Sequence, residues 1–193
     1  METIIIKRKN FEVLKQIDEN SFKLIFKGKT FFGKKFLDVK TELKNYVKQL
    51  KFLATCGLNV PKVLIIDKKS GFVLTTFIEG KNALDELIKG PLEDKFYESI
   101  FSIAFRAKLE RINLNFSPEN FVLMGEKMYY ISREFFNYSE DNNFINKYVK
   151  LWFYTNELVE LLKNKNLPID TSRLKVDYAI NKEIVLTTVK YYM

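Results

Sequence analysis

Residues 2–37 alternate between apolar and polar positions in the manner of β-strands. The segments FEVLKQI and FKLIFKG are separated by the turn-forming cluster DENS at 18–21, and a second turn at Gly28 leads into TFFGKKFL. Because successive side chains of a strand point to opposite faces, these runs predict three antiparallel strands, each with one apolar face.

The period changes after Asp38, where apolar residues recur every three or four positions. These positions are Leu43, Tyr46, Val47, Leu50, Leu53 and Ala54. Their spacing predicts an amphipathic helix that ends at Gly57. PKVLIID and GFVLTTFI then predict two more strands, so the first half contains five strands with one helix after the third. Glu79-Gly80 marks the end of this region.

The second half has a mainly helical pattern. We expect a short helix at ALDELI, a longer helix near 91–111, and a small hairpin in which FVLM and MYYIS pair around Gly125-Glu126. Further helices are expected near 142–164 and 171–191. The aromatic run Trp152-Phe153-Tyr154 is expected to pack into the core from the first of these two helices. The fold class is therefore α+β.

Histidine is absent from the 193-residue chain. This excludes Ser-His-Asp and Cys-His catalysis and most zinc sites, so any chemistry must use carboxylates, lysines, hydroxyls or a magnesium ion. The single cysteine, Cys56, excludes an internal disulfide. No apolar run approaches the roughly 20 residues of a membrane span, and the N-terminus is charged too early for a signal peptide. We therefore expect a cytoplasmic protein.

Positive charge is concentrated in the first half of the chain. The net charge is +8, and residues 23–69 contain twelve lysines against three acidic residues. This predicts an anionic partner: a nucleotide, a phosphorylated small molecule or glycolipid, a nucleic acid, or the inner membrane surface. The alternative is a lysine-rich, solvated surface without a specific partner. In KGKTFFGKKF, alternating strand faces explain the interleaved aromatics better than nucleic-acid stacking does.

The order of these elements resembles the protein-kinase-like fold. Lys35, on the third predicted strand, matches the lysine that holds ATP phosphates in that family, and Lys34 is the competing choice. Gly33 would lie on the same face as Lys35, where the adenine ring passes close. Glu42, early on the following helix, matches the glutamate that pairs with that lysine. The segment Thr76–Glu79 matches the hinge that contacts adenine, which implies a cofactor role for Glu79.

A second group of matches lies at INLNFSPEN, which has the spacing of the kinase catalytic loop. Asn115 falls at the catalytic aspartate, Asn120 at a magnesium ligand, and Ser132 at the second, aspartate ligand. The resemblance is to the small atypical branch, the RIO-type and lipopolysaccharide-core sugar kinases. It implies ATP and magnesium as cofactors and a two-lobed fold, with a five-stranded lobe at 1–78 and a short helical lobe at 79–193.

The chemistry departs from this family at the charged positions. An asparagine at 115 can orient a hydroxyl but cannot accept its proton, and Ser132 is a weak ligand where magnesium prefers a carboxylate. Glu119 and Glu134 are the acids that could compensate. The 18–21 turn carries two carboxylates instead of the glycines that approach phosphate.

Three hypotheses follow. The leading one is a pseudokinase-like binding or regulatory module with a degraded catalytic loop and metal site, in which a protein partner is an open alternative. The second is an active atypical kinase that phosphorylates a sugar or lipopolysaccharide-core hydroxyl, in which Asn115 positions the acceptor. The third, a basic nucleic-acid-binding protein, has only composition in its favour.

Overall fold

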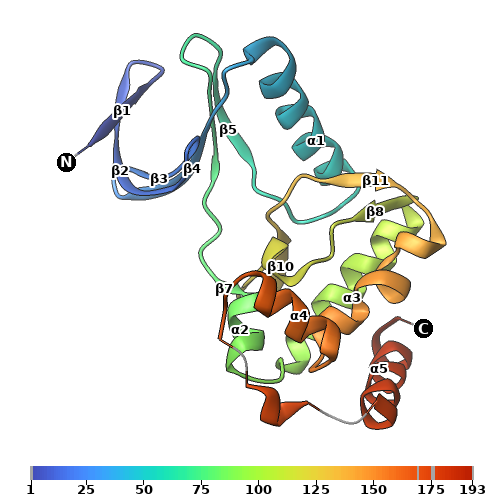
Figure 1. The fold of residues 1–193 in the computed structure, drawn as a ribbon. Helices are drawn as coiled ribbons and strands as arrows, with labels where there is room; N and C mark the ends of the chain where they lie inside the picture. The colour runs from blue at the N-terminus through green and yellow to red at the C-terminus, as the bar shows by residue number, and fades with distance from the viewer. Residues whose placement is uncertain (1, 169, 175–176, 193) are drawn as a thin grey trace. The chain divides into compact units, whose positions relative to one another are not determined.

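The computed structural model describes residues 2–168, 170–174 and 177–192 (Figure 1). Contacts between Cα atoms divide the chain into two compact units. The first unit consists of Met1–Thr55 and Val60–Ile78, and the second of Cys56–Asn59 and Glu79–Met193. In the described ranges, no helix combines the length and the apolar character of a membrane span.

The first unit is built on one antiparallel sheet with strand order β1-β2-β3-β4-β6-β5. The strands are β1 Thr3–Ile6, β2 Lys9–Asp18, β3 Ser21–Phe26, β4 Lys29–Lys35, β5 Val63–Asp67 and β6 Phe72–Thr76. The five predicted strands are all present, but the prediction of a five-stranded sheet is wrong, because the sheet has six.

The sixth strand, β1, was missed because its turn carries no recognisable turn residues. Ile6 pairs with Lys9, which leaves Lys7 and Arg8 as a two-residue loop. Both have positive φ, 50° and 63°, as the tightest hairpin turn requires. Asparagine or glycine normally fills such positions, since other side chains are strained there. A sequence pattern therefore gave no sign that a strand ended at Ile6.

One face of this sheet carries a closed apolar cluster. Its buried members are Ile6, Phe11, Phe22, Leu24, Phe72 and Leu74. Ile4 of β1 and Ile65 of β5 pack against the same cluster, although β1 and β5 are the opposite edges of the sheet. The sheet is therefore strongly curled, and its edge strands converge on a common core.

Asp67 joins the two edges of the curled sheet. Its carboxylate, at the end of β5, accepts hydrogen bonds from the backbone N–H groups of Lys7 at 2.8 Å, Lys69 at 3.1 Å and Ser70 at 3.4 Å. The residue is only 7% exposed. The bond from Lys7, ahead of the bonds from Ser70 and Lys69, lowers the pKa of this carboxyl. A buried charge thus ties the β1–β2 turn to the β5–β6 turn.

The predicted amphipathic helix is confirmed. It consists of a π-helical turn η1 (Val39–Leu43), whose Thr41 N–H is capped by Asp38 at 2.9 Å, followed by α1 (Lys44–Thr55). Its buried residues are Leu43, Tyr46, Val47, Leu50 and Leu53, whereas the predicted core position Ala54 is exposed. The ring of Tyr46 lies 5.1 Å from that of Phe36, just beyond β4.

The second unit contains four α-helices and two small sheets in its described part. The helices are α2 Ala83–Lys89, α3 Asp94–Leu109, α4 Asn156–Asn164 and α5 Asp177–Tyr192. The strands are β7 Lys81–Asn82, β8 Ile112–Leu114, β9 Phe121–Met124, β10 Lys127–Tyr130 and β11 Phe135–Asn137, in the orders β10-β9-β7 and β11-β8. The predicted helices at ALDELI and near 91–111 and the predicted hairpin are confirmed. The last predicted helix, 171–191, is confirmed from Asp177, while residues 175–176 lie outside the described residues.

The predicted continuous helix at 142–164 is wrong. Short segments replace its first half: η3 Glu140–Asn142, η4 Phe144–Tyr148 and η5 Val149–Trp152. Trp152, Phe153 and Tyr154 are all buried, as predicted, but three consecutive residues of a helix point in different directions. Extended backbone at Phe153 and Thr155 lets all three face inward. Thr155 then begins α4 by accepting a hydrogen bond from Leu158 N–H.

Candidate functional site

The first unit carries Lys35, which the resemblance assigns to phosphate binding, and Glu42, which it assigns to an ion pair with Lys35. Lys35 ends β4, and Glu42 lies in η1; both are exposed. No ion pair or hydrogen bond joins their side chains in the described part of this unit. The neighbouring Lys34 is half-buried and points to the opposite face of the strand.

The face of the sheet that Gly33 shares with Lys35 is filled by apolar side chains. Gly33 pairs with Phe22 on one side and Leu74 on the other, and paired residues of neighbouring strands share a face. A Cβ atom at Gly33 would lie 2.6 Å from Leu24 Cδ1 and 3.2 Å from Leu74 Cδ2. Both leucines are fully buried. The space that the glycine leaves open is therefore occupied by the protein itself.

The predicted hinge segment has its own partners. Thr76 N–H donates to Lys62 O at 2.9 Å, and Lys62 N–H donates to Thr76 Oγ1 at the same distance. Lys23 lies over the ring of Phe77, with its Nζ 4.3 Å from the ring centre. Glu79 is exposed and is the first residue of the second stretch of the other unit.

The second unit brings together Asn115, Asn120 and Ser132, the three predicted positions of the catalytic loop and metal site. Asn115 follows β8 directly, and its Oδ1 accepts a hydrogen bond from Ser117 N–H at 3.2 Å. Asn120 Nδ2 donates to Asn115 O at 3.1 Å. Both polar ends of the Asn115 side chain are used, because its Nδ2 donates to Glu134 at 3.2 Å.

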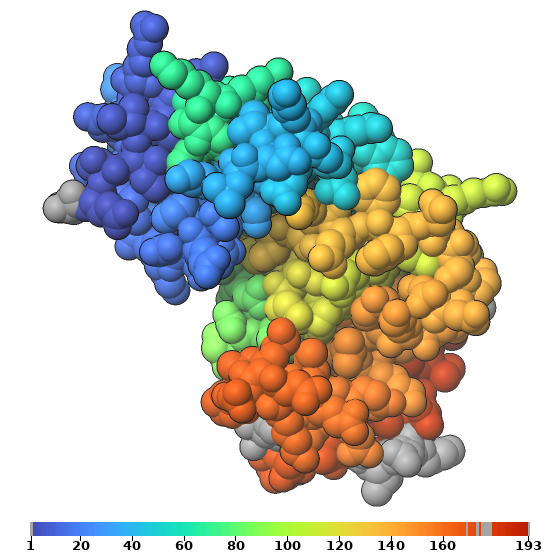
Figure 2. Space-filling model, turned by 45° about the horizontal axis from the view of Figure 1, so that its top comes forward, coloured from blue at the N-terminus to red at the C-terminus, as the bar shows by residue number. Residues whose placement is uncertain are grey.

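Glu134 is the acid that belongs to this group. Its backbone N–H donates to Ser132 Oγ at 3.3 Å, and its carboxylate accepts from Asn115. We refer to Asn115, Asn120, Ser132 and Glu134 as the Asn115 cluster. Glu134 is exposed, and Figure 2 shows the segment around 130–150 at the surface of this unit, in yellow to orange.

Glu119, the other candidate acid, is engaged elsewhere. Its carboxylate accepts a hydrogen bond from Ser117 Oγ and pairs with Lys165 Nζ at 3.1 Å. Its backbone carbonyl accepts from Asn82 Nδ2 at 3.0 Å. Glu119 therefore fixes the loop and leaves Glu134 as the carboxylate that lies beside Asn115.

The hydroxyl of the buried Tyr130 binds two residues of the Asn115 cluster. The sequence analysis did not identify Tyr130 as part of this site. Its hydroxyl donates to Glu134 O at 2.6 Å and accepts from Asn115 N–H at 3.3 Å. The side chain is fully buried, and burial raises its pKa to about 12, so the phenol stays protonated and keeps donating. The alternation of MYYIS could have indicated an inward-facing Tyr130, but it does not indicate the partners of its hydroxyl, which lie four and fifteen residues away.

The chemical capacity of the Asn115 cluster is limited by its composition. It offers one carboxylate, two amides and one hydroxyl, of which only the carboxylate is a strong magnesium ligand or a proton acceptor near neutral pH. Across the described residues, no group of three or more His, Cys, Asp or Glu side chains gathers as a metal site. The cluster is suited to hydrogen bonding with a polar ligand.

No protein-family model matches the chain, and no curated protein matches it.

Proposed function

We propose that the chain is a kinase-like protein of the pseudokinase type, which acts as a binding module and not as a phosphotransferase. The order of elements supports the kinase-like part of this proposal. Strands β2, β3 and β4 precede α1, strands β5 and β6 follow it, and the second unit carries the Asn115 loop and the β9–β10 hairpin. This is the order that the resemblance implies, with β1 as an addition.

The observation that best supports this proposal is that apolar side chains fill the space beside Gly33. We therefore infer that a nucleotide does not bind there in the way that the kinase-like family binds it. Adenine would need the space beside this glycine, which Leu24 and Leu74 occupy. The cluster around them includes Ile4 and Ile6 of the additional strand β1. Opening this space would expose apolar surface at about 25 cal/mol per Å², a cost that ATP binding would have to offset.

The hydrogen bonds of Asn115 support the loss of phosphotransfer. Its Oδ1 already accepts from Ser117 N–H and its Nδ2 already donates to Glu134, which is the pattern of a residue that fixes a loop. A neutral amide cannot serve as a general base, a contribution typically worth about 10²–10⁴ in rate.

The charge of the first unit favours an anionic partner. Most of the lysines between 23 and 69 are exposed. Of the three acidic residues in this stretch, Asp67 is buried and its carboxylate accepts backbone hydrogen bonds. Such a surface attracts an acidic protein or a phosphorylated glycolipid, with an affinity that falls as salt rises.

The proposal predicts that ATP leaves the melting temperature unchanged, with or without magnesium. A ligand at about 100 times its Kd stabilises a protein by about 2.7 kcal/mol. In a chain of this length, that corresponds to a shift of roughly 5–10 °C. Thermal unfolding with ATP, ATP–Mg²⁺ and buffer alone measures this directly. A shift of that size that disappears in Lys35→Ala would contradict the proposal.

The second candidate, an active atypical kinase, is favoured by the position of Glu134. With ATP and magnesium bound, Glu134 and the Oδ1 of Asn120 are the residues that would hold the ion, because Asn120 Nδ2 is already committed to Asn115 O. Asn115 would orient the acceptor hydroxyl.

The two candidates differ in what Glu134→Gln should do to ATP turnover with a sugar acceptor. We expect no turnover above the buffer rate in the wild type and therefore no effect of the substitution. Glu119→Gln is the matched control, because Glu119 lies on the same loop but is paired with Lys165. Turnover that Glu134→Gln abolishes and Glu119→Gln retains would establish the active kinase instead.

A further inference from the structure

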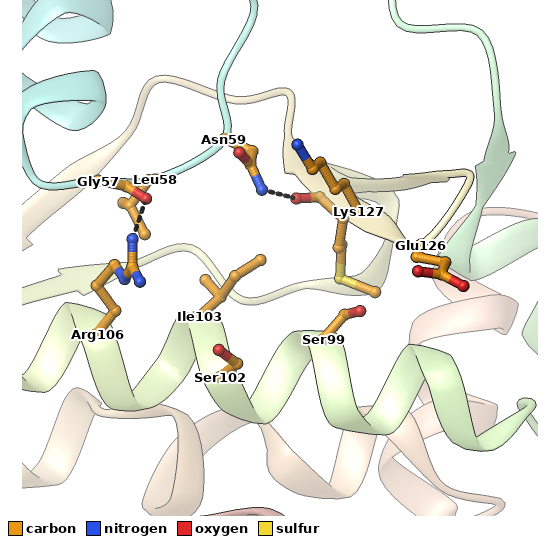
Figure 3. A pocket seen from close by; sticks show the side chains of 10 residues that line it. Gly57, Leu58, Asn59, Ser99, Ser102, Ile103, Arg106, Glu126 and Lys127 are labelled. Carbon is orange, nitrogen blue, oxygen red and sulfur yellow. Dashed lines mark hydrogen bonds between the residues drawn. The ribbon is translucent and has the colours of Figure 1, made fainter.

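A pocket of about 200 Å³ lies within the second unit, and no residue of the Asn115 cluster lines it (Figure 3). Three segments line it: Gly57–Asn59, the α3 residues between Ser99 and Arg106, and the turn and strand at Glu126–Met128. Ile103, Met128 and Leu58 are buried and form its apolar base.

The walls of the pocket are fixed by hydrogen bonds between these segments. Asn59 Nδ2 donates to Met128 O at 3.2 Å, and Tyr130 N–H donates to Asn59 O at 2.9 Å. Arg106 Nη1 donates to Gly57 O. Gly57 has φ of +73°, and a Cβ atom there would lie 2.5 Å from Arg106 Nη1, so only glycine lets the guanidinium approach this closely. The three segments that line the pocket are therefore joined to one another by hydrogen bonds.

Several hydrogen-bond donors that line the pocket have no acceptor among the described residues. Ser99, Ser102 and Arg106 are spaced by three and four residues, which places them on one side of α3. Beyond the bond to Gly57, no hydrogen bond or ion pair of the described residues uses the side chains of Ser99, Ser102, Arg106 or Lys127. A guanidinium and two hydroxyls on α3 thus remain available to a ligand, whereas the Lys127 side chain points away from α3 in Figure 3.

We propose that this pocket binds a small phosphomonoester that also carries an amino or hydroxyl group. A phosphate group can accept several charge-assisted hydrogen bonds at once, and arginine presents its donors as a planar fork that matches this geometry. Glu126 lies at the opposite end of the pocket from Arg106 in Figure 3 and would accept a hydrogen bond from the ligand's amino or hydroxyl group. Its charge would repel a second phosphate.

This site goes beyond the proposed function, since it involves neither the nucleotide positions nor the lysines of the first unit. Phosphoethanolamine is a suitable probe, because it carries one phosphate and one ammonium group. Titration of the full chain, followed by the amide NMR signals of 57–59 and 99–106, should show saturable shifts with phosphoethanolamine, weaker shifts with inorganic phosphate and none with ethanolamine.

Two substitutions test the assignment of the two ends. Arg106→Glu should weaken phosphoethanolamine binding at least about tenfold, because it removes the charged donor of the phosphate end and places a repulsive carboxylate there. Glu126→Gln should weaken phosphoethanolamine but strengthen inorganic phosphate, because it removes a partner for the ammonium and a repulsive charge for the anion. Lys163→Glu, at an exposed α4 lysine that does not line the pocket, is the matched charge control and should leave both affinities within about twofold.

The proposal is overturned if phosphoethanolamine leaves the pocket amides unshifted, or if Arg106→Glu and Lys163→Glu bind it equally well. Arg106→Lys is a third test. It keeps the positive charge but removes the planar pair of guanidinium donors, so the affinity for phosphoethanolamine should still fall. None of these outcomes depends on whether ATP binds, so they separate this proposal from the proposed function.

Discussion

Replacing Asp67 with alanine should destabilise the first unit by about 2–4 kcal/mol, since it removes the acceptor of three backbone N–H groups and leaves them without partners. The bond from Lys7 N–H, at 2.8 Å, is the contact that closes the curled sheet between its edge strands. Urea unfolding followed by circular dichroism measures the loss. The apolar cluster should open at the β1 side first, which faster amide exchange at residues 3–6 would show.

The contribution of Asp67 to the free energy of unfolding should also depend on pH. Its folded pKa is lowered, chiefly by the hydrogen bond from Lys7 N–H, whereas the unfolded carboxyl titrates near its usual value of about 3.9. The stabilisation is therefore fully present above about pH 4 and is lost as the pH falls through the lower folded pKa. The stability difference between wild type and Asp67→Asn should narrow in acid.

Glu12→Gln provides the control for these measurements. Glu12 is an exposed carboxylate of β2 in the same unit, and its removal should change stability by less than about 0.5 kcal/mol. If Asp67→Ala proved as mild as Glu12→Gln, the sheet would be closed by its apolar cluster alone and the carboxylate would have no structural role.

Trp152→Ala should have the largest effect in the second unit, a loss of about 3–5 kcal/mol. Trp152 is fully buried, and its ring centre lies 5.5 Å from that of Phe121 and 6.3 Å from that of Phe144. Its indole N–H donates to Phe116 O at 2.9 Å, within the loop that begins at Asn115. The same side chain therefore supports both the core and the candidate site.

Trp152→Phe separates these two roles. It keeps an aromatic ring but leaves Phe116 O without its donor, at a cost of about 1–3 kcal/mol. Amide exchange at Ser117 and Asn120 should accelerate more than exchange in α3, because the loop loses its anchor. Phe136→Ala, at an aromatic residue 56% exposed on β11, should change neither quantity appreciably. Uniform acceleration across the unit would mean that the indole hydrogen bond has no local role.

The elements with a clear hydrophobic period were predictable from the sequence. Strands β2 to β6, α1, α3 and the β9–β10 hairpin follow local alternation or helical spacing, which a single chain displays directly. The extra strand β1 was hidden because Lys7 and Arg8 adopt a left-handed turn without the usual residues. The broken helix at 142–164 was hidden because burial of Trp152, Phe153 and Tyr154 overrides local propensity.

The sequence predicted which residues form the candidate site, but it did not predict the hydrogen bonds between them. The spacing of Asn115, Asn120 and Ser132 identified residues that the structure places together. The choice of Glu134 over Glu119 depends on the pairing of Glu119 with Lys165, and the support from Tyr130 depends on tertiary packing. Likewise, the filling of the space at Gly33 by Leu24 and Leu74 follows from the pairing of β3, β4 and β6, which no local pattern encodes.

The short stretch Cys56–Asn59 gives the chain an interleaved architecture. It belongs to the second unit, although first-unit residues precede and follow it. A fragment that starts at Glu79 would lack the carbonyl groups of Gly57 and Asn59, which accept hydrogen bonds from Arg106 and Tyr130, and the Asn59 side-chain amide, which donates to Met128 O. The two units therefore cannot be exchanged independently. A gene fusion or truncation that cuts between 78 and 79 would separate the second unit from Cys56–Asn59, which is part of its own fold. Chimaeric proteins should therefore contain both units.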